Sequence, residues 1–214
     1  MANKQKLELT WIGKENRPKL EPRILLEDPA QSYHAKQRVT DNDIFDNRLI
    51  FGDNLLALKA LEQEFAGRVK CIFIDPPYNT GAAFEHYNDG IEHSLWLSLM
   101  RDRMVILRKL LAPDGFFCCH IDDQEGAYLK VLLDEMFGRE NCLVTFFVQV
   151  RYTNKTLSED SDFQKVIEHC LIYTHDPKLS RPIKNLEEYK VEKFEWEITE
   201  LGKGRALSLG VCRS

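Results

Sequence analysis

The sequence predicts an open α/β fold with a mostly parallel sheet. From about residue 48 onwards, short apolar runs alternate with segments of helical periodicity. One of these runs, residues 69–75 (VKCIFID), is almost continuously apolar up to its final aspartate. Such runs are typical of strands buried on both faces of a parallel sheet, and their alternation with helices is the pattern of open α/β sheets.

The first expected elements are a strand, a helix and a second strand. Residues 48–53 (RLIFGD) form an apolar run that ends in a glycine and an aspartate. The following segment, NLLALKALEQEF, carries apolar residues at positions 55, 58, 61 and 65, a spacing that places them on one helix face. The strand at 69–75 comes next.

The pattern then repeats with a second helix and a third strand. Between residues 95 and 111 the apolar side chains fall on one helix face, APDG (112–115) predicts a turn, and FFCCHI (116–121) predicts a buried strand. A third helix is expected to end at Gly138, with Asp122 and Glu125 at capping-box spacing. Two further strands, CLVTFFVQV and KVIEHCLIYT, have no helix between them, so we expect one to run antiparallel at the sheet edge.

Composition divides the chain into three parts. Residues 1–47 are polar and weakly periodic and predict an irregular N-terminal arm, residues 48–178 carry the α/β pattern, and residues 179–214 are charged and predict the start of a smaller unit. The net charge of −5 argues against a general polyanion binder but allows one basic face. No apolar run approaches the roughly 20 residues of a membrane span, and no signal core is present, so we expect a cytoplasmic protein.

The six cysteines predict reduced structural thiols. None of them has C-x-x-C spacing, and Cys118 and Cys119 are adjacent within an apolar run. We therefore predict no metal site and no disulfide framework.

Two aspartates directly follow predicted strands, where ligands bind in open α/β sheets. They are Asp53, after residues 48–52, and Asp75, after residues 69–74. Capping of the following helix is an alternative interpretation that suits Asp53 well. The same alternative holds for Asp122 and Asp123, and Trp96 fits a core position better than a site.

The residues after Asp75 indicate a particular chemistry. Pro76 and Pro77 fix φ and remove two backbone donors, which leaves the Asp75 carboxylate, the Pro76 carbonyl and the Tyr78 ring in a rigid arrangement. A flat heterocycle can stack on the ring, at about 1–3 kcal/mol per base, while its exocyclic amino group donates to the two oxygens. The amino nitrogen then becomes a nucleophile toward an electrophilic carbon about 3 Å away.

The motif and its surroundings resemble a known family. DPPY at 75–78, together with LIFGDNLLALKAL, IDPPYNTG, FEHYNDGIEHSLWL and IEHCLIYTHD, is similar to the β-group DNA adenine N6-methyltransferases, and most to the amino-terminal half of the Mod subunit of type III restriction-modification systems. The resemblance covers residues 48–178 and, more loosely, the chain to about 210. It implies an incomplete Rossmann-like fold of the S-adenosylmethionine-dependent methyltransferase type.

The resemblance also implies roles for individual residues. Asp75 and Pro76 would hold the amino group of a flipped adenine, and Tyr78 would stack on the base. Pro77, Asn79 and Thr80 would shape the substrate loop. The residues implied beside the cofactor, S-adenosylmethionine, are Gly52, Asp53, Asn54 and Asp75. The implied partners are double-stranded DNA, a second copy in a homodimer, and a restriction (helicase/nuclease) subunit.

The sequence departs from the family pattern in one respect. No F-x-G-x-G cofactor loop occurs, and the G-x-G at 202–204 is interpreted as a turn. We therefore expect the amino-terminal half of a longer enzyme, with open strand edges that predict low solubility or dependence on a partner. Two alternatives stay open: a truncated, non-catalytic remnant or interaction module, and a methyltransferase for cytosine N4.

Overall fold

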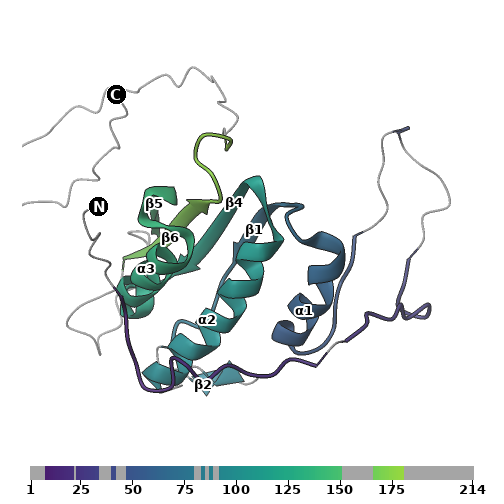
Figure 1. Ribbon diagram of the computed structural model, residues 1–214, viewed down its shortest axis with the longest axis horizontal. Coiled ribbons are helices and arrows are strands. Elements are labelled where there is room, and N and C mark those ends of the chain that lie inside the picture. Colours follow the sequence, from purple (N-terminus) through teal and green to yellow (C-terminus); the bar gives the residue numbers. More distant parts are fainter. Residues whose placement is uncertain are drawn as a thin grey trace, which may run out of the picture. The chain divides into compact units, whose positions relative to one another are not determined.

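The computed structural model describes residues 8–21, 23–33, 40–41, 47–79, 92–150 and 166–180, together with the backbone of residues 83–84 and 87–88 (Figure 1). The described residues belong to the first of two compact units, Met1–Arg181. The second unit, Pro182–Ser214, lies outside them, and so does the G-x-G at 202–204.

The elements follow the predicted alternation of helices and strands. In chain order they are α1 (Asn54–Phe65), β1 (Val69–Ile74), β2 (Ala83–Phe84), β3 (Tyr87–Asn88), α2 (His93–Leu110), β4 (Leu111–Ile121), α3 (Asp123–Phe137), the 3-10 helix η1 (Arg139–Asn141), β5 (Cys142–Gln149) and β6 (Ile167–Thr174).

The main sheet has the strand order β1-β4-β6-β5, and β2 pairs with β3 in a separate two-stranded sheet. Strands β1 and β4 are parallel, whereas β6 runs antiparallel to both β4 and β5. The predicted open α/β fold is confirmed. One of the last two strands, β6, runs antiparallel as expected, but it lies between β4 and β5 and not at the edge of the sheet. The described part of the sheet is mixed, with its parallel pair at the β1 end.

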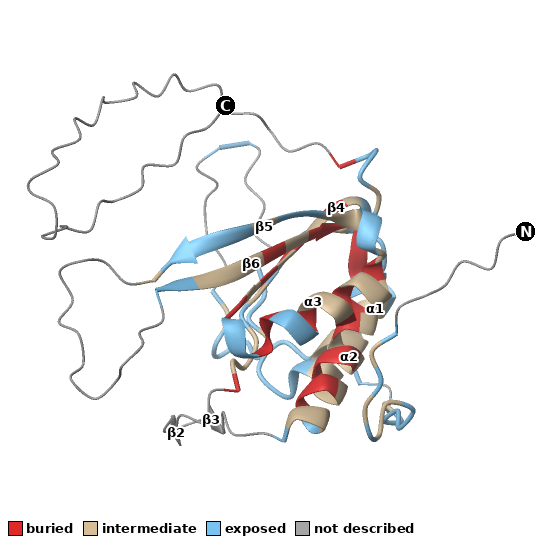
Figure 2. Cartoon of the chain, turned by 90° about the vertical axis from the view of Figure 1, so that its left-hand side faces the viewer, coloured by how far each residue is buried: buried red, intermediate tan, exposed pale blue. Residues whose placement is uncertain are grey.

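The helices cover one face of the sheet. Figures 1 and 2 show α2 and α3 against the sheet, with α1 beside α2. Along β4, Phe117, Cys119 and Ile121 are fully buried beneath the helices, and the Phe117 ring stacks on Phe137 with centroids 5.0 Å apart. The alternate positions of β4 are only partly buried. In α1, the residues predicted on one face, at 55, 58, 61 and 65, all pack against this core.

The strand expected at residues 48–53 is not formed. Residues 47–53 adopt no regular structure, and Leu49 and Phe51 are fully exposed. A strand needs a neighbour that takes up its backbone hydrogen bonds. In the described sheet β1 is the edge strand, so the apolar run at 48–52 has no strand beside it.

The turn expected at residues 112–115 is instead an irregularity within β4. Leu111 pairs with Val69 and Phe116 pairs with Cys71, so four residues of β4 bulge opposite a single residue of β1. A Cβ atom on Gly115 would come within 2.9 Å of the Val69 carbonyl oxygen. The close approach of the two backbones therefore requires glycine at this position.

The N-terminal arm is irregular where it is described, and it packs on α2 and α3. The Trp11 indole donates to Ser98 Oγ at 2.8 Å, and Arg101 donates to the Asn16 carbonyl at 2.8 Å. Lys14 binds Glu135 of α3 at 2.8 Å. These contacts attach the arm to the helical layer.

Two further observations concern composition. The five described cysteines are free, in line with the expected reduced thiols, and Cys212 lies outside the described residues. Among the described residues, no helix combines the length and the apolar character that a membrane crossing requires.

Candidate active site

The loop Asp75–Asn79 follows the carboxyl end of β1. Because β4 is parallel to β1, its last residues, His120 and Ile121, lie at the same end of the two strands. Strand β6 begins there, since it pairs with β4 in the antiparallel direction and places Cys170 opposite His120. Side chains from three strands can therefore meet beside this loop.

Tyr78 is held by two of these strands. Its hydroxyl oxygen lies 2.8 Å from Nδ1 of His120 and donates to Oε2 of Glu168 at 3.1 Å. Burial, together with hydrogen bonding and negative charge from Asp75 and Glu168, raises the pKa of Tyr78 well above its ordinary value. The phenol is therefore neutral and keeps its proton to donate.

Asp75 combines solvent exposure with a place in the same cluster. Its side chain is 61% exposed, and its Oδ1 atom lies 3.8 Å from Nδ1 of His120. The Nε2 atom of His120 lies 3.2 Å from Glu168 Oε2. We refer to Asp75, Tyr78, His120 and Glu168 as the Tyr78 cluster. Within it, Asp75 has the most exposed side chain.

The carbonyl of Pro77 accepts a hydrogen bond from the Trp96 indole nitrogen at 2.8 Å. Trp96 lies on α2 and is fully buried, so its expected core position is confirmed. The indole N–H gives this core residue a second role, because it fixes the backbone of the loop from beneath. Pro76 and Pro77 are themselves partly buried.

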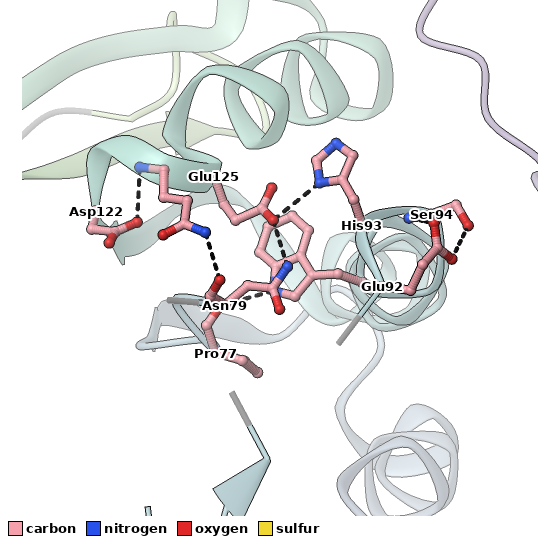
Figure 3. Close-up of polar contacts among 9 residues, drawn as sticks. Pro77, Asn79, Glu92, His93, Ser94, Asp122 and Glu125 are labelled. Atoms are coloured by element: carbon pink, nitrogen blue, oxygen red, sulfur yellow. Dashed lines mark hydrogen bonds and ion pairs between the residues drawn. The ribbon is translucent and has the colours of Figure 1, made fainter. Parts of the chain in front are cut away.

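Asn79 ends the described part of the loop in a left-handed conformation, with φ of 58°. Its side-chain amide donates to Oε1 of Glu125 at 2.8 Å, and its carbonyl accepts from the Gln124 side chain at 2.7 Å (Figure 3). Asparagine is one of the few residues other than glycine that readily adopt this conformation. The loop therefore turns sharply after Tyr78 and is tied to the first turn of α3.

The start of α3 is built from a cap and a buried carboxylate. Asp122 caps the helix by accepting from the Gln124 backbone N–H at 3.0 Å, so the capping interpretation of Asp122 is confirmed. Glu125 is 2% exposed, and its Oε1 atom also lies 3.0 Å from His93 Nδ1. Figure 3 shows Glu125 between Asn79 and His93.

The predicted cofactor residues lie at the start of α1. Asp53 caps this helix, with Oδ1 accepting from the backbone of Leu55 and Leu56 at 3.0 and 3.1 Å, so its capping role is confirmed. The Asn54 side chain accepts from Arg103 of α2 at 2.7 Å, and Gly52 adopts φ of +143°. The expectation that Asp53 follows a strand was wrong, because residues 48–53 form no strand.

Thr80 lies outside the described residues. The sequence did not reveal His120, Glu168 or the indole contact of Trp96, and it placed Glu125 in a capping box, whereas the Glu125 side chain contacts Asn79 and His93. His120 could have been found, because it ends a predicted strand as Asp75 does. Glu168 and Glu125 gave no comparable signal, since they come from the start of an antiparallel strand and from a helix.

Comparison with known proteins places this loop in a family context. The profile of the N6/N4 DNA methylases matches residues 69–206. The HindVI Mod subunit of Haemophilus influenzae is 40% identical over 146 residues, which cover 65% of this chain and 20% of that protein. The type III restriction-modification enzyme EcoPI Mod subunit of Escherichia phage P1 is 32% identical over 237 residues, covering 94% of this chain and 35% of that protein.

A third relative, the StyLTI Mod subunit of Salmonella typhimurium, is 33% identical over 207 residues, covering 82% of this chain and 31% of that protein. The chain thus spans between a fifth and about a third of the length of these relatives. Among solved structures, a Thermus thermophilus protein in complex with S-adenosyl-L-methionine matches with 15% identity and a TM-score of 0.41, over 60% of this chain and 54% of that chain.

Proposed function

Because the chain belongs to the N6/N4 DNA methylase family, we propose that its Asp75–Tyr78 loop is the catalytic site of a site-specific DNA methyltransferase. The proposed substrate is the N6 amino group of adenine in double-stranded DNA, and the proposed methyl donor is S-adenosylmethionine. The observation that carries the proposal is the loop itself: an exposed carboxylate beside an anchored tyrosine at the carboxyl end of β1.

The loop has the groups that an exocyclic amine requires. The Asp75 carboxylate and the Pro76 carbonyl accept hydrogen bonds from the two amino N–H groups and thereby raise the electron density on nitrogen. The Tyr78 ring stacks on the base, and its hydroxyl is already held by His120 and Glu168. Because the loop is fixed before the base arrives, little reorganisation is needed to reach the reacting geometry.

The adenine amino group is not accessible in this way inside a duplex, so the base must leave the stack before it reaches Asp75. The 61% exposure of the Asp75 side chain allows such a base to approach from solvent. Pro77, Asn79 and Thr80 would form the loop that borders the flipped base.

S-adenosylmethionine, when bound, supplies an electrophilic methyl group. The residues proposed to hold it are Asp75 and the segment Gly52, Asp53 and Asn54. In this segment Asp53 is exposed, and its described helix-cap bonds are both made through Oδ1. Gly52 adopts a positive φ that side chains rarely allow, and no atom lies within 4 Å of the position that a Cβ would occupy. These features fit the approach of a polar ligand.

We further propose that the protein works in a restriction-modification system in the cytoplasm. The similarity to three Mod subunits supports this setting. The partners would be a restriction (helicase/nuclease) subunit and a second copy of the methyltransferase in a homodimer.

Replacement of Asp75 tests the proposal. In the protein that carries this chain, Asp75→Ala should abolish transfer of labelled methyl groups from S-adenosylmethionine to DNA, and Tyr78→Ala should strongly reduce it. A matched control is Asp114→Ala, because this half-exposed aspartate pairs with Lys70 at the opposite end of β1 and β4. Unchanged adenine methylation by the Asp75→Ala protein would refute the assignment.

The same DNA decides which base is modified. The matched family includes both N6 and N4 methylases, and the amino groups of adenine and cytosine pose the same chemical problem to this loop. Nucleoside analysis after complete digestion should yield N6-methyladenine. N4-methylcytosine in its place would assign cytosine as the substrate.

A second candidate, which the sequence leaves open, is a non-catalytic interaction module. Calorimetric titration of the 214-residue chain with S-adenosylmethionine separates the two. Micromolar binding supports a working cofactor site in this chain, whereas absence of binding together with absence of methyl transfer supports the module.

A further inference from the structure

Three consecutive residues of the loop are each held by a different part of the fold. The Pro77 carbonyl is bound by Trp96 of α2, the Tyr78 hydroxyl by His120 of β4 and Glu168 of β6, and Asn79 by the first turn of α3. Asp75 precedes these anchors and is itself exposed. The position of its carboxylate therefore depends on the anchored residues that follow it.

The anchor at Asn79 acts against an unfavourable backbone conformation. A non-glycine residue in the left-handed region is disfavoured because its Cβ comes too close to a carbonyl oxygen, although asparagine tolerates this conformation better than most residues. Asn79 is 8% exposed, and both its side chain and its carbonyl are hydrogen-bonded to α3. These two bonds are together strong enough to offset the cost.

The carboxylate that binds Asn79 is unusual in its burial. Glu125 is 2% exposed, and among the described residues its Oε2 atom has no hydrogen-bond partner. A buried carboxylate with one unsatisfied oxygen is costly, and an apolar side chain of similar size would usually stabilise a helix face better. The stability of α3 therefore does not account for Glu125, whereas its contacts with Asn79 and His93 do.

We propose that Glu125 is a positioning residue for methyl transfer, which holds Asn79 in its left-handed conformation and thereby sets the orientation of Asp75 and Tyr78. The proposal deepens the proposed function and rests on it. Glu125 does not contact the reacting atoms. It acts through Asn79, so its removal should lower the rate of the chemical step more than the affinity for the cofactor.

Three variants and a control separate this role from a general effect on folding. Glu125→Ala removes the acceptor, and Glu125→Gln keeps an oxygen that can accept from Asn79. Asn79→Gly adopts positive φ freely but offers no side chain to hold. The control is Glu140→Gln, because Glu140 is an exposed glutamate beyond the end of α3.

The first measurement is the rate of methyl transfer to DNA by the protein that carries this chain. We expect kcat to fall about 100-fold in Glu125→Ala, a loss typical of a misplaced reacting group, while KM for S-adenosylmethionine changes less than about threefold. Glu125→Gln should regain kcat to within about tenfold of the wild type, Asn79→Gly should resemble Glu125→Ala, and Glu140→Gln should match the wild type. Wild-type kcat in Glu125→Ala or in Asn79→Gly would overturn the proposal.

The second measurement needs no activity. Hydrogen exchange at the amide of Asn79 and at the Trp96 indole, followed by NMR, reports how firmly the loop is held. We expect faster exchange in Glu125→Ala and Asn79→Gly and unchanged exchange in Glu140→Gln. If the wild type transfers no methyl group, the proposed function fails, but this measurement still tests Glu125. Unchanged exchange in both loop variants would show that Glu125 does not hold the loop.

Discussion

The hydroxyl oxygen of Tyr78 lies 2.8 Å from Nδ1 of His120. This contact links the loop after β1 to the neighbouring strand, and Glu168 extends it to β6. The aromatic ring that is proposed to stack on the base is therefore oriented by the sheet. The ring planes of Tyr78 and His120 meet edge to face, at 73°.

Replacement of Tyr78 should separate the anchor from the ring. Tyr78→Phe keeps the stacking surface but loses the contacts with His120 and Glu168, so methyl transfer should fall about tenfold, as expected for about 1–1.5 kcal/mol of lost hydrogen bonding. Tyr78→Ala should lose a further 1–3 kcal/mol or so, because stacking is also removed. Single-turnover rates measure both effects, with Tyr33→Ala, in the exposed arm, as the control. Equal rates for the two Tyr78 variants would show that the ring contributes nothing.

Trp96→Phe should weaken both the core and the loop. The smaller ring leaves a cavity at a fully buried position, and the Pro77 carbonyl loses its donor, so unfolding by urea should require about 2–4 kcal/mol less. Trp11→Phe is the matched control, since Trp11 also donates its indole N–H, but to Ser98. Both variants should lose stability, whereas reduced methyl transfer per folded molecule is expected of Trp96→Phe alone.

Glu135→Gln should loosen the N-terminal arm. Burial lowers the pKa of Lys14, but hydrogen bonds with Glu135 and Glu8 outweigh it and raise the pKa overall, so Lys14 is a cation at neutral pH. The Lys14 side chain is 12% exposed, and a neutral partner would cost about 1–3 kcal/mol. Trypsin should then cut the arm after Lys19 faster than in the wild type. Glu21→Gln, which alters an exposed ion pair, should leave the cutting rate unchanged.

Stability should fall in alkaline solution through Cys118. Burial and the nearby thiols of Cys71 and Cys170 raise the pKa of Cys118 from 9.0 to about 11. The unfolded chain releases this proton from about pH 9, whereas the folded chain keeps it until about pH 11, so stability is lost across this range. In reducing buffer, urea unfolding at pH 8 and pH 11 should show a decrease that is smaller by about 1 kcal/mol in Cys118→Ala. An equal decrease in both proteins would contradict the assignment.

Much of the fold could be predicted because periodicity encodes which side chains are buried. The four apolar positions of α1 and the strand at β1 are found where spacing and an apolar run place them. Residues 48–53 show the limit. Their hydrophobicity is that of a strand, but strand formation depends on a neighbour that hydrophobicity does not specify.

The motif of the site could be predicted from the sequence, but the residues that hold the loop in place could not. The DPPY motif identifies Asp75 and Tyr78 directly, because their proposed chemistry depends on neighbouring residues in the sequence. His120, Glu125 and Glu168 lie 42, 46 and 90 residues away from the loop residues they contact. Strand register and the packing of α3 bring these side chains to the loop, and neither the register nor the packing can be predicted from a sequence pattern.

The separation between Tyr78 and Glu168 also has a consequence for synthesis on the ribosome. At about 5–20 residues per second, translation of the 90 residues between them takes on the order of ten seconds. During this time the loop can already form its contacts with α2 and α3, whose sequences end at Leu110 and Phe137. The contact of Tyr78 with Glu168 cannot form until β6 has been translated. The tyrosine anchor is therefore completed last, after the strand that carries Glu168 has been translated and has joined the sheet.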